Sequence, residues 1–142
     1  MNFSYSYYSI KNKEVVEAYE VPDQNSLLAI PSHKASLIAK LKLTRHLSFN
    51  PTVLWLGERY GYTSYDTAGD PVLEKFSPSL LANLFICYDG LFVKGLDIGL
   101  GVYDILNTKT QFIQPYSGDH APLPGPSREI VFRLSYNLNF NE

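Results

Sequence analysis

The stretch from residue 34 to residue 43 alternates between apolar and polar side chains with a single exception, Ile38, and reads Lys34-Ala35-Ser36-Leu37-Ile38-Ala39-Lys40-Leu41-Lys42-Leu43. Side chains of a β-strand point to opposite faces in turn, so a period of two collects the apolar residues on one face. That face carries Ala35, Leu37, Ala39, Leu41 and Leu43. The stretch therefore predicts a strand with one apolar face and one polar face.

Five further segments have the same period. The clearest is the last, in which Ile130, Phe132, Leu134, Tyr136, Leu138 and Phe140 alternate with mostly polar residues. The others cover residues 3–7, 47–55, 80–88 and 96–102. Pro51 lies inside one of them, and because proline cannot donate to a β-ladder we expect a bulge or a strand start there. The sequence thus predicts an all-β fold of about six antiparallel strands.

The connections between these segments alternate in length. The linkers near 44–46 and 89–94 are short, whereas those near 12–32, 60–77 and 107–127 are long and rich in Gly, Pro, Asp, Asn and Ser. Membrane β-barrels have short periplasmic turns and longer extracellular loops. With six strands and a periplasmic C-terminus, every short linker falls on the periplasmic side.

The composition favours strands in a membrane over a soluble sheet. Aromatic residues make up 14% of the chain and charged residues 18%, against about 25% charged residues in a typical soluble domain. A membrane barrel carries its apolar residues in alternation and needs no long apolar run. Aromatic residues near the strand ends suit the girdles at the membrane surfaces, namely Tyr5, Tyr7, Trp55, Tyr60, Tyr88, Tyr136 and Phe140.

No pattern in the sequence indicates catalysis or metal binding. Cys87 is the single cysteine, and His33, His46 and His120 are too far apart to match a metal-ligand spacing. No serine lies in a nucleophile elbow. The net charge of −2 gives no argument for nucleic acid. We therefore expect no enzyme activity, no metal, no cofactor and no nucleic-acid partner.

The long linkers contain the candidate ligand-binding residues. Arg59, Tyr60 and Tyr62 could pair with an anionic ligand or stack on an aromatic one, and Asp119 and His120 could contact a ligand at the entrance of a barrel. The alternative roles are a membrane-interface belt for the tyrosines and ordinary solvation for the loop residues.

Two stretches near the C-terminus resemble motifs of the TonB-dependent outer-membrane receptors. Residues 102–107, Val-Tyr-Asp-Ile-Leu-Asn, resemble the Val-x-Asn-Leu-(Phe)-Asp motif of the penultimate barrel strand. Residues 122–129, Pro-Leu-Pro-Gly-Pro-Ser-Arg-Glu, are similar to the Pro-Gly-x-x-Arg start of the last strand. Asp104 stands where the family usually has Asn, and Ser127 where it usually has Gly. Residues 30–37 resemble the Pro-x-His start of an earlier strand.

The end of the chain adds a third likeness. The alternating residues Phe132, Leu134, Tyr136, Leu138 and Phe140 look like the terminal aromatic signal that the barrel assembly machinery recognises in this family. Asn141 and Glu142 follow Phe140, whereas the family commonly ends at the aromatic residue.

The resemblance implies a barrel of the 22-stranded, plugged kind. Such receptors take up a scarce ligand, most often an iron–siderophore complex, through an inner-membrane complex that pulls on an N-terminal plug. We interpret residues 1–142 as the C-terminal part of such a barrel in the bacterial outer membrane, with no plug domain and no signal peptide, and inactive alone. The implied partners are the rest of the barrel and plug, outer-membrane lipid, the assembly machinery and the energy-coupling complex.

Two other classes stay open at this point. A small self-contained barrel needs at least eight strands, which hairpins within residues 12–32 and 60–77 could supply. A soluble β-sandwich binding module would also have alternating strands. In the barrel interpretation Lys40, Lys42 and Arg133 point into the lumen, where they contact plug carboxylates, steer an anionic ligand or are simply solvated.

Overall fold

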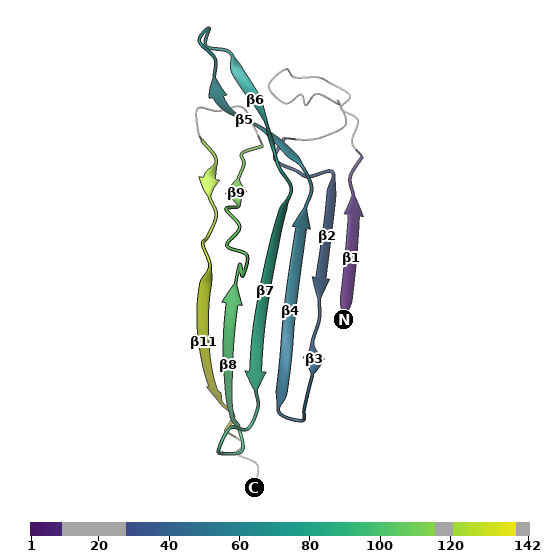
Figure 1. Cartoon of the computed structure of the whole chain (residues 1–142), viewed down its shortest axis with the longest axis vertical. Helices are drawn as coiled ribbons and strands as arrows, with labels where there is room; N and C mark the ends of the chain where they lie inside the picture. Colours follow the sequence, from purple (N-terminus) through teal and green to yellow (C-terminus); the bar gives the residue numbers. More distant parts are fainter. Residues whose placement is uncertain (10–27, 116–120, 139–142) are drawn as a thin grey trace.

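The computed structural model describes residues 1–9, 28–115 and 121–138, and these residues form eleven β-strands without a helix (Figure 1). The strands are β1 (Asn2–Tyr7), β2 (His33–Ile38), β3 (Leu41–Lys42), β4 (Leu47–Leu56), β5 (Arg59–Tyr65), β6 (Pro71–Phe76), β7 (Ser79–Tyr88), β8 (Leu96–Tyr103), β9 (Gln111–Phe112), β10 (Leu123–Pro124) and β11 (Glu129–Tyr136). Within the described residues, no helix is long and apolar enough to cross a membrane.

Seven of the strands form one antiparallel sheet in the order β1-β2-β4-β7-β8-β11, with β3 continuing β2 along β4. Each strand position therefore lies beside its neighbour in the sequence. The six positions coincide with the six segments of alternating sequence, so the predicted strands are confirmed. The pairs β5–β6 and β9–β10 form two separate two-stranded sheets.

The register of the sheet brings the apolar residues of all six positions onto one face. Directly opposed residues of an antiparallel pair share a face. Across β1, β2, β4 and β7, neighbouring strands oppose Phe3 to Leu37, Leu37 to Val53 and Val53 to Ala82. Across β7, β8 and β11, they oppose Leu84 to Val102 and Val102 to Ile130. The result is a continuous apolar face, opposite a face of mostly small and polar side chains.

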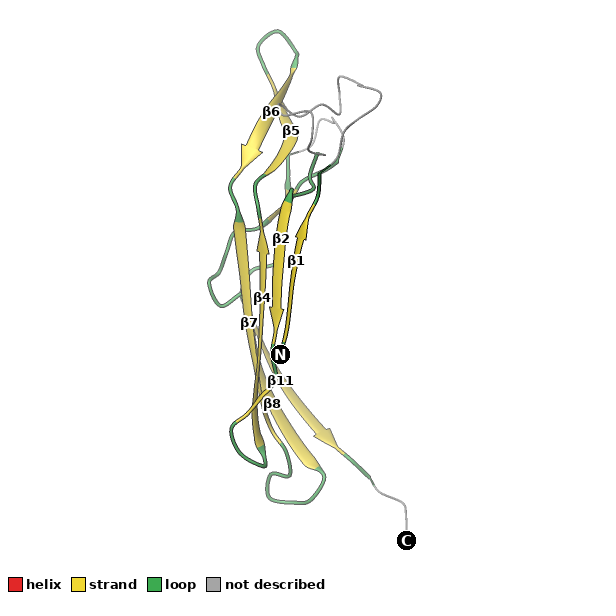
Figure 2. Cartoon of the chain, turned by 90° about the vertical axis from the view of Figure 1, so that its right-hand side faces the viewer, coloured by secondary structure: helices red, strands yellow, loops and turns green. Residues whose placement is uncertain are grey.

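The described residues leave this apolar face uncovered. Phe3 is 66% exposed, Phe132 67% and Leu134 61%, and the hydrophobic residues found buried are Leu28 and Ala39 alone among those described. The exposed surface is 10316 Å², against about 7,400 Å² for a compact soluble protein of this mass. Figure 2 shows a single curved layer of strands. A soluble sandwich needs a second sheet on the apolar face, and the described residues supply none.

Pro51 neither bulges nor begins a strand, so that expectation was wrong. β4 passes through Pro51 and pairs with β7 residue for residue, and β2 and β3 pair with β4 in one unbroken register. The Pro51 carbonyl accepts a hydrogen bond from the Ala39 backbone N–H over 3.1 Å. Proline has no N–H to return the bond. The ladder is therefore interrupted between β2 and β3 although the chain stays extended.

The two ends of the sheet differ as the linker lengths predict. Residues 43–46 and 89–95 make tight turns at one end, the end that β11 also reaches, whereas the strand ends that the three long connections join lie toward the other end (Figure 1). The short turns are joined to each other, because the Asp89 N–H donates to the His46 carbonyl over 2.8 Å. The hairpin β5–β6 projects from the second long connection.

The sheet is open. The hairpin expected within residues 60–77 is present as β5–β6, but it forms its own sheet and adds no strand to the main one. The hairpin expected within 12–32 falls mostly outside the described residues. β1 and β11 are the two edges, and the described strands do not pair them with each other. The main sheet formed by the described strands therefore has fewer than the eight strands that a small closed barrel needs.

Candidate functional site

The three long connections meet at β5. The Ala29 N–H donates to the Tyr60 carbonyl over 2.8 Å, which joins the first connection to the hairpin. The Arg59 Nη1 donates to the Gln111 carbonyl over 3.2 Å, which joins the hairpin to the third connection. We call this group, Ala29, Arg59, Tyr60 and Gln111, the loop junction. It lies at the loop end of the sheet, where a barrel would have its extracellular mouth.

Arg59 is a structural member of the loop junction. Its side chain is 9% exposed, and burial lowers the pKa of the guanidinium, which nevertheless keeps its charge at neutral pH. The Nε atom has no hydrogen-bond partner among the described residues. The Nε–H of the buried guanidinium can therefore still donate a hydrogen bond to an additional acceptor. Its role in ligand binding stays a prediction.

The other candidate residues are divided between described and undescribed parts of the chain. Tyr60 and Tyr62 are half-buried and share one face of β5, opposite the face that carries Arg59. The three residues are therefore neighbours in sequence that point to two different sides. Asp119 and His120 lie outside the described residues, and their contact with a ligand stays a prediction.

Tyr60 also lines a cleft of about 390 Å³, together with Ser32, His33, Trp55, Gly57, Glu58 and Pro78. We call it the rim cleft. The end of the first long connection and both ends of the second line it, together with the side chain of Trp55 from β4. Sequence alternation alone did not indicate this cleft, because its walls come from three separate segments.

The two C-terminal stretches that resemble receptor motifs contact each other. The Arg128 Nη2 donates to the Ile105 carbonyl over 2.6 Å, and its Nε donates to the Asp104 carbonyl over 3.4 Å. Asp104 and Asn107 have φ angles of 48° and 51°. Asn and Asp tolerate this left-handed conformation better than other side chains. The two motifs thus form one turn that closes the base of the last long connection.

Asp104 is held in this turn by its neighbours. Its N–H donates to the Asn83 Oδ1 over 2.9 Å, and its own Oδ1 accepts the Thr108 N–H over 2.9 Å. The side chain is 4% exposed, and its Oδ2 has no partner among the described residues. The usual Asn of the family motif would place a neutral amide at that position.

Phe85 is a large aromatic side chain on the polar face that alternation did not reveal. The ring of Phe85 lies over Gly99 and Gly101, where an added Cβ atom would come within 2.6 Å and 2.5 Å of the ring. The two glycines leave the space that the ring occupies. Two glycines spaced by two in a strand are the sequence signal of such a close approach.

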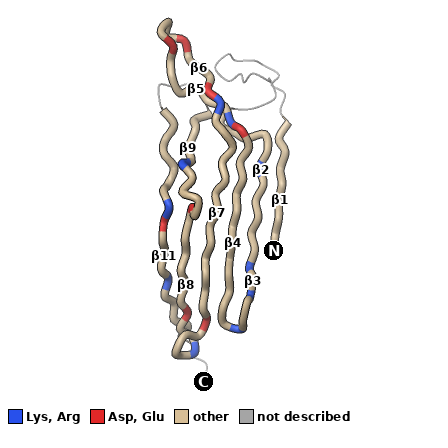
Figure 3. The backbone as a smooth tube through the Cα atoms, viewed as in Figure 1, with Lys and Arg blue, Asp and Glu red and all other residues tan. Residues whose placement is uncertain are grey.

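The charged residues of the sheet lie on its polar face or near its ends. Lys42 is opposed to Ser48, and Arg133 to Gly99, both on the polar face, and Lys40 precedes Lys42 by two residues. β1, β4 and β7 carry no charged side chain at all. Figure 3 shows long uncharged lengths of strand in the middle of the sheet. This distribution suits a wall with lipid on one side and a wet lumen on the other.

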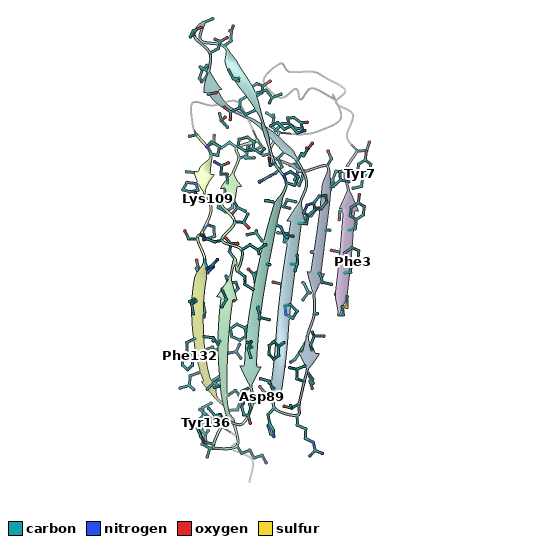
Figure 4. The ribbon with its side chains drawn as sticks, viewed as in Figure 1. Phe3, Tyr7, Asp89, Lys109, Phe132 and Tyr136 are labelled. Carbon is teal, nitrogen blue, oxygen red and sulfur yellow. The ribbon has the colours of Figure 1, made fainter. Side chains whose placement is uncertain are left out.

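The proposed assembly signal lies on an edge. Phe132, Leu134 and Tyr136 alternate on the exposed apolar face of β11, and Leu138 follows the strand with 63% exposure. Figure 4 labels Phe132 and Tyr136 on this strand. Phe140 lies outside the described residues. An exposed edge strand can pair with another strand. Recognition by the assembly machinery stays a prediction.

No protein-family model matches the chain, and no curated protein matches it either. Solved structures do. The ferric enterobactin receptor of Pseudomonas aeruginosa covers 75% of this chain with a TM-score of 0.56 and 24% identity. The ferripyoverdine receptor of the Pseudomonas aeruginosa outer membrane, bound to ferripyoverdine, covers 75% with a TM-score of 0.64 and 14% identity.

The chain has the fold of a siderophore-receptor barrel. It spans 16% of the length of the ferric enterobactin receptor and 14% of the ferripyoverdine receptor. The open antiparallel sheet is therefore one sector of a barrel fold, as the motifs at 102–107 and 122–129 indicate. At these identities the likeness establishes the siderophore-receptor barrel fold and leaves the ligand to be inferred.

Proposed function

We propose that the chain forms part of the barrel wall of a TonB-dependent transporter in the bacterial outer membrane. The observation that carries the proposal is the single-layer sheet with one continuous apolar face, which matches a sector of two siderophore receptors. Apolar side chains in alternate positions face lipid, while backbone groups pair between strands. A wall of this kind separates lipid from a lumen and does not by itself catalyse a reaction.

The open edges mean that the wall needs further strands. Unpaired backbone groups at β1 and β11 would be costly in lipid, which offers no hydrogen bonds. The partners are therefore the remainder of the barrel and its plug, the outer-membrane lipid and the barrel assembly machinery. An inner-membrane energy-coupling complex acts through the plug. Residues 1–142 alone transport nothing.

A ferric siderophore is the ligand class that we favour. The two matched proteins are receptors for ferric enterobactin and ferripyoverdine. At the loop end, Arg59 offers a buried guanidinium, whose Nε has no partner among the described residues, on one side of β5, and Tyr60 and Tyr62 offer phenol rings on the other side. These groups can pair with an anionic ligand and stack on an aromatic one.

The test is uptake of radioactive iron–siderophore by cells that lack their own receptors. Cells that make the protein carrying this chain should accumulate iron, and cells that make residues 1–142 alone should not. Uptake by residues 1–142 alone, or a heat-modifiable band at 16.1 kDa on a detergent gel, would favour a small autonomous barrel. Uptake by neither, with the protein correctly inserted, would reject the siderophore ligand.

A further inference from the structure

The outer edge of β11 carries the backbone groups that an added strand would use. In an antiparallel pair, residues that exchange hydrogen bonds with the partner alternate with residues whose N–H and C=O groups point the other way. The Asn137 N–H donates to the Gly95 carbonyl over 2.8 Å, one residue beyond the unbroken register of β11 with β8. The odd-numbered residues of β11 therefore bond to β8. The even-numbered residues turn their backbone groups outward, namely Ile130, Phe132, Leu134 and Tyr136.

The same edge continues into β10, where its chemistry is different. Figure 1 shows residues 121–128 as the continuation of β11 on the same side of the sheet. The Gly125 N–H donates to the Thr110 carbonyl over 2.8 Å, and the neighbouring Pro124 is opposed to Gln111 in the register of β10 with β9. The odd-numbered residues therefore bond inward here too, and by the period of two the even-numbered ones face outward. These are Pro122, Pro124 and Pro126, which we call the proline row.

The proline row cannot take part in a β-ladder. Proline has no N–H, so this part of the edge presents carbonyl oxygens and no donor. A strand that paired with it would leave its own opposing carbonyls without a partner. From Ile130 to Tyr136, by contrast, each outward residue has both a donor and an acceptor. The edge thus changes from a complete ladder edge to an acceptor-only edge between Pro126 and Ile130.

Arg128 lies at this change and binds the chain toward β8. Its N–H, which alternation would turn outward, donates to the Asn107 Oδ1 over 3.4 Å. Its guanidinium donates to the carbonyls of Asp104 and Ile105. The acceptors all belong to the turn that follows β8. Arg128 and the proline row therefore act together, because one attaches the last long connection to β8 and the other withholds donors from the outer edge.

We propose that the proline row ends the seam, which is the pairing of β11 with the next strand around the barrel. That strand pairs with the outward groups from Ile130 to Tyr136 and leaves the chain at Arg128. The paired length is about 20 Å, most of the apolar band of about 25 Å that a barrel presents to lipid. In lipid every backbone group needs a partner, whereas water can satisfy the carbonyls above it. This limit rests on the proposed barrel wall and adds the point at which its seam stops.

The strand that occupies the seam belongs to the same barrel and not to a second copy of the chain. Addition of another molecule starts at strand edges that are exposed to water, and proline on an edge strand prevents it. Pro124 and Pro126 are exposed and lie on the part of the edge beyond the seam. The last long connection can therefore run beside its neighbour without joining that neighbour's sheet.

The test measures hydrogen exchange at single backbone amides of the full protein that carries this chain, in detergent micelles. The double variant Pro124→Ala/Pro126→Ala restores two outward N–H groups. If the proline row ends the seam, the neighbouring strand extends onto them, and both new amides should exchange about tenfold more slowly than their intrinsic rates. The even-numbered amides from Ile130 to Tyr136 should be protected in the wild type and in the variant alike.

Pro51→Ala is the matched control, because it restores an N–H inside the sheet. The Ala39 N–H donates to the Pro51 carbonyl, so the new amide at position 51 should donate to the Ala39 carbonyl and be protected. The Gly125 amide, which donates to the Thr110 carbonyl, is an internal reference, and its protection should not change. These two readouts show that the measurement detects a backbone pair and that the variants keep their fold.

Two outcomes would overturn the seam limit. If the new amides at positions 124 and 126 exchange at their intrinsic rates beside protected amides at 130–136, another feature ends the pairing. If their protection grows with protein concentration, the edge pairs with a second copy of the chain. Unprotected even-numbered amides at 130–136 in the full protein would instead contradict the proposed barrel wall, so a failure of that function is distinguishable from a failure of the seam limit.

Discussion

The guanidinium of Arg128 donates a hydrogen bond of 2.6 Å to the backbone carbonyl of Ile105, across a sequence separation of 23 residues. This bond joins the end of β8 to the start of β11 below the last long connection. Its acceptor belongs to a turn with two residues in the left-handed conformation. The Arg128–Ile105 contact therefore lets a long loop leave and rejoin the wall without separating the strands.

Replacing Arg128 should weaken this closure. Arg128→Ala removes both side-chain bonds to the turn, and Arg128→Lys cannot reproduce the planar fork. We expect the free energy of unfolding of the barrel to fall by about 1–2 kcal/mol for the alanine variant, because charged donors to carbonyls contribute about that much. Urea titration of the protein in lipid vesicles measures it. A lysine variant as stable as the wild type would contradict the requirement for the fork.

Replacing Asp104 by asparagine should stabilise the same turn. The amide keeps the Oδ1 acceptor for the Thr108 N–H and tolerates the positive φ angle. It also removes a buried carboxylate oxygen that has no partner in the described part of the chain. We expect a gain of about 1 kcal/mol. Asp104→Ala is the matched control and should lower the free energy of unfolding. A lower free energy of unfolding in both variants would mean that the negative charge of Asp104 itself stabilises the turn.

A side chain at position 101 should collide with Phe85. In Gly101→Val the Cβ atom would lie 2.5 Å from the Phe85 Cδ2, so the ring must move. We expect a cost of about 1–3 kcal/mol, as for other overpacked sites. Phe85→Ala should relieve most of it in a double-mutant cycle. Strict additivity of the two changes would show that ring and glycine do not interact.

Charge substitutions test which face meets lipid. Leu37 is opposed to Phe3 and Val53 on the apolar face, so Leu37→Arg should cost about 2–4 kcal/mol if it lies near the middle of the bilayer. Lys40→Glu, on the polar face, should be tolerated. The yield of folded, protease-resistant protein in the outer membrane reports both. Equal tolerance of the two substitutions would contradict the assignment of Leu37 to the lipid-facing side and of Lys40 to the lumen-facing side.

The tip of the β5–β6 hairpin should loosen in acid. Backbone N–H groups of Asp70, Ala68 and Gly69 lower the pKa of the Asp66 carboxyl below its ordinary value of 3.8. A lowered folded-state pKa stabilises the tip fully above the ordinary value, and the stabilisation is lost as the pH falls through the lowered one. The protection of the Ala68 and Asp70 amides against exchange, relative to the intrinsic rate at each pH, should therefore fall below pH 3.8. Asp66→Asn should show no such pH dependence.

The strands could be predicted because their signal is local. In residues 34–43 and 130–136 the alternation fixes both the strand and its apolar face, and the observed register agrees with both. Pro51 misled the prediction because a missing N–H weakens one ladder without bending the strand. Phe85 was missed because alternation assigns faces by polarity, whereas this ring is accommodated by Gly99 and Gly101 on the neighbouring strand.

The loop contacts could not be predicted from the sequence. Nothing local to Arg59 indicates that its guanidinium reaches the Gln111 carbonyl, 52 residues later. The bond depends on how two long connections pack above the sheet. The resemblance to receptor motifs assigned Asp104 and Arg128 to the last two strands, but the hydrogen bonds of Arg128 to the Asp104 and Ile105 carbonyls depend on the folded turn.

The hairpin β5–β6 has its own ladder and adds no strand to the main sheet. Its amino acids can therefore change by mutation, or the hairpin can lengthen, while the strand order and register of the wall are kept. At its tip only Gly69 is constrained by its backbone, because its φ of 89° favours glycine although an added Cβ atom would meet nothing within 4 Å. In the proposed outer-membrane barrel, the hairpin is therefore a segment in which evolution can diversify the sequence while the barrel wall stays unchanged.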